Sequence, residues 1–265
     1  MRFICIHGLV FTCLSLAFSS LSLAVEDPQL RETLNKHWEA MGGNNWLKVE
    51  SIRLSGTIER NGRAADICIV KKRPNQIRAT VTLPLPGGED EKLQVIRAHD
   101  GEAAWTATRL AGAPVMKKDP LPPDAAAELL ADAGVLPPLI KLWREGGKLK
   151  RSTPETKGAL TLIPISSQPG NGETSHVFYL NHETHLLHAI ENRTTHSVTK
   201  TTFADYTWEA GVRLAKTSKV ESSETGHSKL ETKSIQIGVG IYDEYFSSTG
   251  GPEAQTYTLS RPTED

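Results

Sequence analysis

The feature that most constrains the fold is a change in hydrophobic period at Ser51. From this residue Ile52, Leu54 and Ile58 alternate with polar side chains, which is the period of two of a half-buried strand. Similar strand-like runs cover residues 64–72, 77–83, 93–95, 103–107, 160–165, 177–180, 186–190, 198–207, 212–220 and 230–239. Short turn segments separate these runs, so the pattern predicts sequential antiparallel pairing in a mainly β fold.

Two dipeptides predict tight turns between runs. Asn61-Gly62 follows the first run and predicts a two-residue hairpin turn. Asp100-Gly101 predicts a type I′ turn that sends the chain back toward Trp105. Asp100 is also a candidate catalytic acid, but the turn position explains this residue without any chemistry.

One helix precedes the strands. Asp27 can cap it, Pro28 suits the first helical position, and an apolar stripe runs through Leu34 and Trp38. Gly42-Gly43 predicts its end. The stripe indicates that this helix packs on the sheet that follows.

Two further helices are expected between the strand blocks. Residues 124–133 are good helix formers, and Pro137-Pro138 opens a second helix through Leu139, Leu142 and Trp143. These helices form either a flap or plug that can leave the sheet, or a fixed cover over one face of the core. The sequence leaves both interpretations open.

Residues 1–24 have the pattern of a cleaved signal peptide. Arg2 precedes an apolar stretch over 3–16, and Ser22-Leu23-Ala24 predicts cleavage before Val25. The alternative, a membrane anchor, is disfavoured because the apolar stretch is shorter than the roughly 20 residues that a spanning helix needs. We therefore expect a secreted protein with one domain over 25–247 and a flexible polar tail over 248–265.

Loss of the leader leaves Cys68 as the lone cysteine, so no internal disulfide is expected. Cys68 lies among apolar neighbours, which favours a buried small side chain over a nucleophile. Without Arg2 the chain has 29 basic against 31 acidic residues. This near-neutral charge gives no indication of nucleic-acid binding.

No recognisable catalytic or metal site appears in the sequence. His182, His185 and His188 are evenly spaced and flanked by His176 and His196, but residues three apart on a strand point to opposite faces. No GxSxG motif, P-loop or GxGxxG motif is present. We predict no catalytic residues, no metal and no cofactor. A hydrolase or metal enzyme would have to assemble its site from positions that the sequence does not reveal.

A curved sheet of amphipathic strands leaves a concave apolar face that side chains, helices or a lipid must fill. The aromatic residues Trp105, Trp143, Tyr206 and Trp208 are either part of that wall or ordinary core. The candidate cavity-lining residues are Val81, Val95, Trp105, Leu139, Leu142 and Trp143.

The order of motifs resembles the outer-membrane lipoprotein-sorting family of the LolA/LolB type. The motifs that carry the resemblance are the helix end at Gly42-Gly43, SIRLSGTI (51–58), KRPNQIR (72–78), HDGEAAW (99–105), FADYTWEAGVRLAKTSKV (203–220) and IQIGVGIYDEYF (235–246). Ala215 stands where a proline is usual, and Gly238 or Gly240 lies near the usual asparagine.

This resemblance implies an open antiparallel half-barrel of about eleven strands, with an N-terminal helix and two inserted helices over its concave face. Family members that sort lipoproteins hold acyl chains in that hollow, and some relatives act as envelope-stress sensors. The resemblance therefore implies a non-catalytic periplasmic carrier for a lipid or lipoprotein acyl group. The alternative is an envelope-stress sensor or scaffold that binds a protein partner. Neither function involves nucleic acid or a transmembrane span in the mature chain.

Overall fold

The computed structural model describes residues 27–85, 91–114, 117–167, 175–194, 197–224 and 226–247. The predicted leader (1–24) and polar tail (248–265) lie outside these residues, so the predicted domain limits stay predictions. None of the helices in the described ranges has the length and apolar character needed to cross a bilayer.

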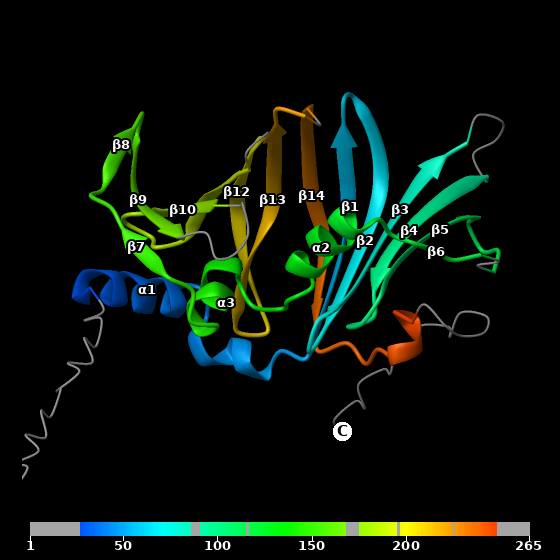
Figure 1. The fold of residues 1–265 in the computed structure, drawn as a ribbon, viewed down its shortest axis with the longest axis horizontal. Helices are drawn as coiled ribbons and strands as arrows, with labels where there is room; N and C mark the ends of the chain where they lie inside the picture. Colours follow the sequence, from blue (N-terminus) through cyan, green and yellow to red (C-terminus); the bar gives the residue numbers. More distant parts are fainter. Residues whose placement is uncertain are drawn as a thin grey trace, which may run out of the picture.

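The described chain forms one open antiparallel sheet of 14 strands, in the order β6-β5-β4-β3-β2-β1-β14-β13-β12-β11-β10-β9-β7, with β8 paired to β9. Two sequential meanders meet where the first strand pairs with the last, β1 with β14. Figure 1 shows the sheet as a curved wall. The prediction of a mainly β, open antiparallel half-barrel is confirmed, although its strand number of about eleven is too low.

The eleven runs predicted from alternation are all strands, and three additional strands of two or three residues raise the number. The strands are β1 Ser51–Arg60, β2 Arg63–Lys72, β3 Gln76–Pro84, β4 Lys92–His99, β5 Ala104–Leu110, β6 Asp119–Pro120, β7 Leu149–Arg151, β8 Glu155–Lys157, β9 Leu160–Ser167, β10 Ser175–Asn181, β11 Leu187–Arg193, β12 Val198–Glu209, β13 Val212–Ser222 and β14 Gly226–Ile237. The three short strands are β6, β7 and β8.

The two predicted turns differ in geometry. Asn61 and Gly62 have φ of 51° and 74°, as the type I′ hairpin turn requires. At Asp100-Gly101 only the glycine has a positive φ, 107°, so the type I′ prediction is wrong there. Asp100 Oδ1 instead accepts hydrogen bonds from the backbone N–H groups of Glu102 and Ala103, at 3.0 and 2.8 Å. The carboxylate of Asp100 thus shapes a longer loop.

The helices begin and end close to the predicted residues. Helix α1 spans Pro28–Ala40, and the Asp27 side chain accepts the N–H of Gln29 at its start. A 3-10 helix, η1, follows at Gly43–Lys48. The two inserted helices are α2, Pro123–Asp132, and α3, Pro138–Arg144. A last 3-10 turn, η2, covers Asp243–Tyr245.

The strand register assigns side chains to two faces of the sheet, because residues paired across antiparallel strands point to the same side. We call the side that carries Ile52, Leu230 and Ile190 the inner face, and the side that carries Val70 and Trp105 the outer face. Helices α1 and α3 pack on the inner face, and α2 contacts β3, β4 and β5. Figure 1 shows α2 and α3 in front of the sheet.

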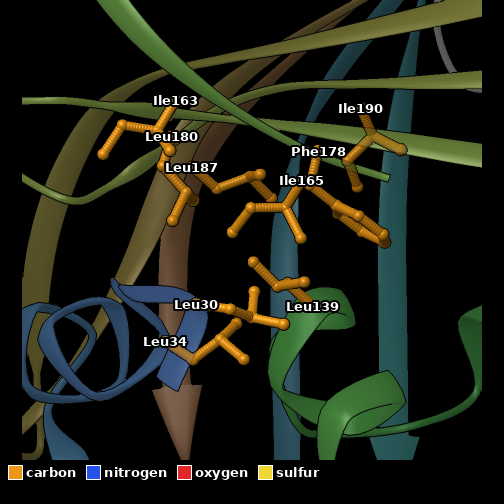
Figure 2. Close-up of a cluster of buried hydrophobic side chains, with 9 residues drawn as sticks. All are labelled: Leu30, Leu34, Leu139, Ile163, Ile165, Phe178, Leu180, Leu187 and Ile190. Carbon is orange, nitrogen blue, oxygen red and sulfur yellow. The ribbon is translucent and has the colours of Figure 1, made fainter. Parts of the chain in front are cut away.

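The core at the β9–β11 end of the inner face joins α1 and α3 to the sheet. Figure 2 shows Leu30 and Leu34 of α1 and Leu139 of α3 pointing toward aliphatic side chains of the strands. The strand residues of this cluster are Ile163, Ile165, Phe178, Leu180, Leu187 and Ile190. Since Leu139 is fully buried, α3 is a fixed part of the core.

The C-terminal segment after β14 covers the outer face of β2–β5. Phe246 is fully buried, and its carbonyl accepts the indole N–H of Trp105 at 2.8 Å. Arg78 donates to the carbonyl of Tyr245 at 2.9 Å and lies over the tyrosine ring. Trp105 therefore anchors the outer cover of the sheet.

Candidate functional site

A cavity of about 450 Å³ lies between the inner face of the sheet and the segment that joins α2 to α3. Its roof is Ala131–Leu142, with Gly134 and Leu136 above the strands. The strands β1, β2 and β10–β14 form its opposite wall. A hollow of this size falls in the range of roughly 300–1,000 Å³ that is typical of small-molecule sites.

The walls are mainly apolar. The wall residues from the sheet include Ile52, Leu54, Leu187, Ile190, Phe203, Leu214 and Leu230. At the base a buried cluster around Trp38, Met41 and Trp46 joins α1 and η1 to β1 and β13. Trp46 is fixed there because its indole N–H donates to the carbonyl of Met41 at 2.7 Å. The base of the cavity is therefore a packed part of the core.

One fully buried histidine, His37 of α1, lines the cavity. Its Nδ1 lies 2.8 Å from the backbone carbonyl of His185 and donates to it in the neutral tautomer. Among the described residues its Nε2 has no hydrogen-bond partner. Burial lowers the pKa of His37 to about 4, and the hydrogen bond to His185 only partly opposes this effect. His37 is thus neutral at physiological pH.

The titration of His37 predicts a pH-dependent stability. Because the folded pKa, about 4, lies below the usual 6.5, the unfolded chain binds the proton first as pH falls. His37 should therefore remove about 3 kcal/mol of unfolding free energy between pH 6.5 and 4. His37→Asn keeps a donor near the position of Nδ1 and has no titrating group. Urea unfolding across this range should show a flatter pH dependence in the variant, and identical slopes in both proteins would contradict the assignment.

Tyr206 and the His176–Asn192 pair supply further fixed polar groups of the wall. The hydroxyl of Tyr206 donates to the carbonyl of Leu187 at 2.7 Å, and burial raises its pKa. His176 Nδ1 and Asn192 Oδ1 lie 2.7 Å apart. These groups are satisfied within the protein, so they shape the cavity without any need for a reacting partner.

Two lysines reach the roof of the cavity. Lys71 of β2 donates from Nζ toward the carbonyl of Gly134 at 3.5 Å, and Lys141 of α3 packs over the same glycine. A Cβ at Gly134 would lie 3.4 Å from Nζ of Lys141. Burial lowers the pKa of Lys71, Asp132 raises it and Lys141 lowers it.

Among the six predicted lining residues, all of which are described, only Leu142 lines this cavity. Leu139 lies beneath it in the packed core, and Trp143 is half-buried between two core clusters. Val81 and Val95 are paired on the inner face but lie further along the sheet, where α2 contacts β3 and β4.

Trp105 stands apart from the cavity altogether. Trp105 of β5 pairs with Ala98 of β4, and Ala98 pairs in turn with Arg78 of β3. All three side chains therefore lie on the outer face. Val81 is three residues after Arg78 on β3 and so faces the opposite way. Trp105 packs with Ile96, Ala98 and Ala107 under the C-terminal segment.

The other candidate groups for chemistry stay separate. Across the described ranges, no three His, Cys, Asp or Glu side chains lie close enough to hold a metal ion together. His196 lies outside the described residues. Cys68 is half-buried beside the C-terminal segment, and Ser55 Oγ lies 3.7 Å from its Sγ.

Sequence reasoning missed most of the wall, including Lys71. One signal for Lys71 was present: Ile67, Ile69 and Lys71 share a strand face. A lysine in the apolar register of a half-buried strand indicates a polar function or a polar partner on that face. The register confirms this placement, with Lys71 paired to Ile52 and Ile77.

Comparisons with known proteins find similar folds among solved structures. The sequence matches no protein-family model, and it matches no curated protein. Among solved structures, a DUF1329 family protein from Desulfovibrio piger aligns at 12% identity and a TM-score of 0.52, over 84% of this chain and 98% of that one. LolA superfamily protein NE2245 from Nitrosomonas europaea aligns at 9% identity and a TM-score of 0.51, over 82% and 96%.

The chain therefore shares its fold with these two solved structures, one of which is a LolA superfamily protein, and this likeness agrees with the resemblance seen in the sequence motifs. At 9% and 12% identity, this likeness concerns the fold and leaves the ligand open. MucB also aligns over 86% of this chain, at a TM-score of 0.24, which is too low to indicate a shared arrangement of the whole fold.

Proposed function

We propose that the protein is a non-catalytic periplasmic binding protein, or carrier, for a lipid or lipoprotein acyl group. The observation that carries this proposal is the apolar cavity of about 450 Å³ between the inner face and the α2–α3 segment. The wall offers extended aliphatic and aromatic surface, which suits an acyl chain. Several of its polar groups, among them Tyr206, His176 and Asn192, already make hydrogen bonds within the protein.

The roof supports a route of entry. Helix α3 is fixed because Leu139 and Ile140 are fully buried, whereas α2 has no buried residue. Local opening is easiest where few apolar side chains are buried. Helix α2 would therefore move aside, while Ala133 and Val135 of the following linker, which are buried, stay in the core with α3. In this proposal α2 is a movable flap, and α3 is a fixed cover of the core.

A cavity-filling substitution tests the proposal. Leu230→Trp places a large ring in the wall at a half-buried position of β14. Binding of a fluorescent fatty acid to the purified protein should weaken by at least about tenfold, because the chain and the ring compete for one space. Leu110→Trp, at an exposed position of β5 outside the cavity, should leave the affinity unchanged.

Native mass spectrometry of protein purified from its own envelope adds a second measurement. The account predicts a co-purified lipid on the wild type and less of it on Leu230→Trp. Protein that carries no lipid and takes up no fatty acid would refute the proposal. The sensor or scaffold alternative would then be tested by pull-down of a partner from envelope extract.

A further inference from the structure

Two lysines, Lys71 and Lys141, lie beside apolar residues in the lining of the cavity. Lys71 lies on the inner face of β2, and its paired neighbours Ile52 and Ile77 are both buried. An ammonium group that is partly removed from water beside such apolar neighbours is costly unless a compensating group is present. The hydrogen bond from Lys71 Nζ to the carbonyl of Gly134, at 3.5 Å, is too long to supply much compensation.

A second ammonium group comes to the same place. Lys141 of α3 extends along Gly134, where an added Cβ would lie 3.0 Å from its Cδ and 3.4 Å from its Nζ. Two like charges brought together beside an apolar wall repel each other. Lys71 and Lys141 come from a strand and from the roof, so the meeting point lies at the junction of the two cavity walls.

The surrounding charges leave a positive excess. The charged side chains that line the cavity are Lys71, Lys141, Arg213 and Lys216 on the basic side and Asp132 and Glu145 on the acidic side. Among the described residues, neither Lys71 nor Lys141 has a carboxylate within 4 Å. Asp132 acts on Lys71 only at longer range.

We propose that the cavity binds a single-chain amphiphile with an anionic head group, whose carboxylate or phosphate oxygens bind the Nζ atoms of Lys71 and Lys141 beside Gly134. This inference rests on the proposed function and specifies its ligand class. The acyl chain then lies along the apolar wall of Leu54, Leu214 and Leu230. The bound anion compensates both ammonium groups, which explains why two lysines are kept in an apolar cavity.

The volume favours one chain. Liquid water occupies about 30 Å³ per molecule, and a methylene group takes up a similar space. The cavity of about 450 Å³ is therefore large enough for at least roughly 15 such groups, the length of one long acyl chain. A lipid with two or three chains would need a much larger opening of the roof. The lowered pKa of Lys71 agrees with an ammonium group that lacks a close anion.

Three probes with the same chain separate the head group from the tail. Hexadecanoate, hexadecyl phosphate and hexadecanol are titrated as monomers into the delipidated mature chain, and affinities are measured by calorimetry. The wild type should bind at least one of the two anions about tenfold more tightly than the alcohol, because charge-assisted hydrogen bonds add binding energy. The tighter of the two anions identifies a carboxylate or a phosphate head group.

The double variant Lys71→Met/Lys141→Met should lose this preference and keep its affinity for hexadecanol. Lys219→Met is the matched control: it changes an exposed lysine of β13, next to the cavity residue Ser218 but pointing away, and should behave as wild type. Thermal unfolding of each variant verifies that the fold is intact. If the double variant unfolds, each single variant should show a partial loss of the preference.

The outcomes separate this inference from the proposed function. Equal affinity for anions and alcohol in the wild type, or a preference that survives in the folded lysine variants, would overturn the inference while acyl binding stands. Binding of none of the three probes would overturn the proposed function itself.

Discussion

Leu139→Ala is expected to lower the free energy of unfolding by about 4 kcal/mol, toward the upper end for such a truncation. Leu139 is 0% exposed and packs among Leu30 and Leu34 of α1 and Phe178 of β10 (Figure 2). These neighbours belong to different elements that are also held elsewhere, so the vacated space cannot close easily. Urea unfolding of the purified variant measures the loss.

Leu142→Ala is the matched comparison for this prediction. Leu142 is half-buried in the same helix and lines the cavity, so its truncation enlarges an existing hollow. We expect a loss of about 1 kcal/mol, together with a changed affinity for acyl probes. Equal destabilisation by the two truncations would contradict the view that α3 is anchored through Leu139.

Gly56→Val is expected to cost about 4 kcal/mol or more, which is exceptional for a single substitution. Gly56 lies at the irregularity where β1 pairs with β14. A Cβ there would come within 2.0 Å of the carbonyl oxygen of Glu231. Because the obstacle is backbone, the pair of strands that joins the two halves of the sheet would have to separate.

Thr57→Val provides the control for Gly56→Val. Thr57 is the next residue of β1, is half-buried and points to the opposite face. Its replacement keeps the branched shape, removes only a hydroxyl at a half-buried position and should change the free energy of unfolding by less than about 1 kcal/mol. A comparable loss in both variants would show that a valine anywhere in this part of β1, and not the close strand approach, sets the effect of Gly56→Val.

Much of the fold was predictable from the sequence because its strands are long and amphipathic. Alternation identified eleven strands, and capping and glycine signals located α1. The missed strands β6, β7 and β8 have two or three residues each. Such segments are too short to show a period, and tertiary pairing alone makes them strands.

The candidate site was harder to predict, because alternation says which residues share a face but not what covers each face. Trp105 and Val81 illustrate this limit: both belong to apolar registers, yet they lie on opposite sides of the sheet. The cover over Trp105 comes from Phe246, which is 141 residues away in sequence. Only the three-dimensional path of the C-terminal segment shows that the wall at Trp105 is already occupied.

The inserted helices combine the two interpretations that the sequence left open. Leu139 and Ile140 make α3 a fixed cover of the core, and α2 lies on the sheet without a buried side chain. Two segments of similar helical character thus differ in how much apolar surface they bury. That difference depends on the distance between helix and strands, which the residue pattern of a single segment does not contain.

The position of a bound acyl chain tests the central claim most directly. Hexadecanoate with a photoreactive diazirine on its chain is bound to the mature protein, irradiated and located by peptide mass spectrometry. The account predicts cross-links to β1 near Leu54, to β14 near Leu230 and to the α2–α3 linker, all of which line the cavity. Cross-links confined to the outer face around Trp105 and Phe246, or labelling unaffected by Leu230→Trp, would contradict it.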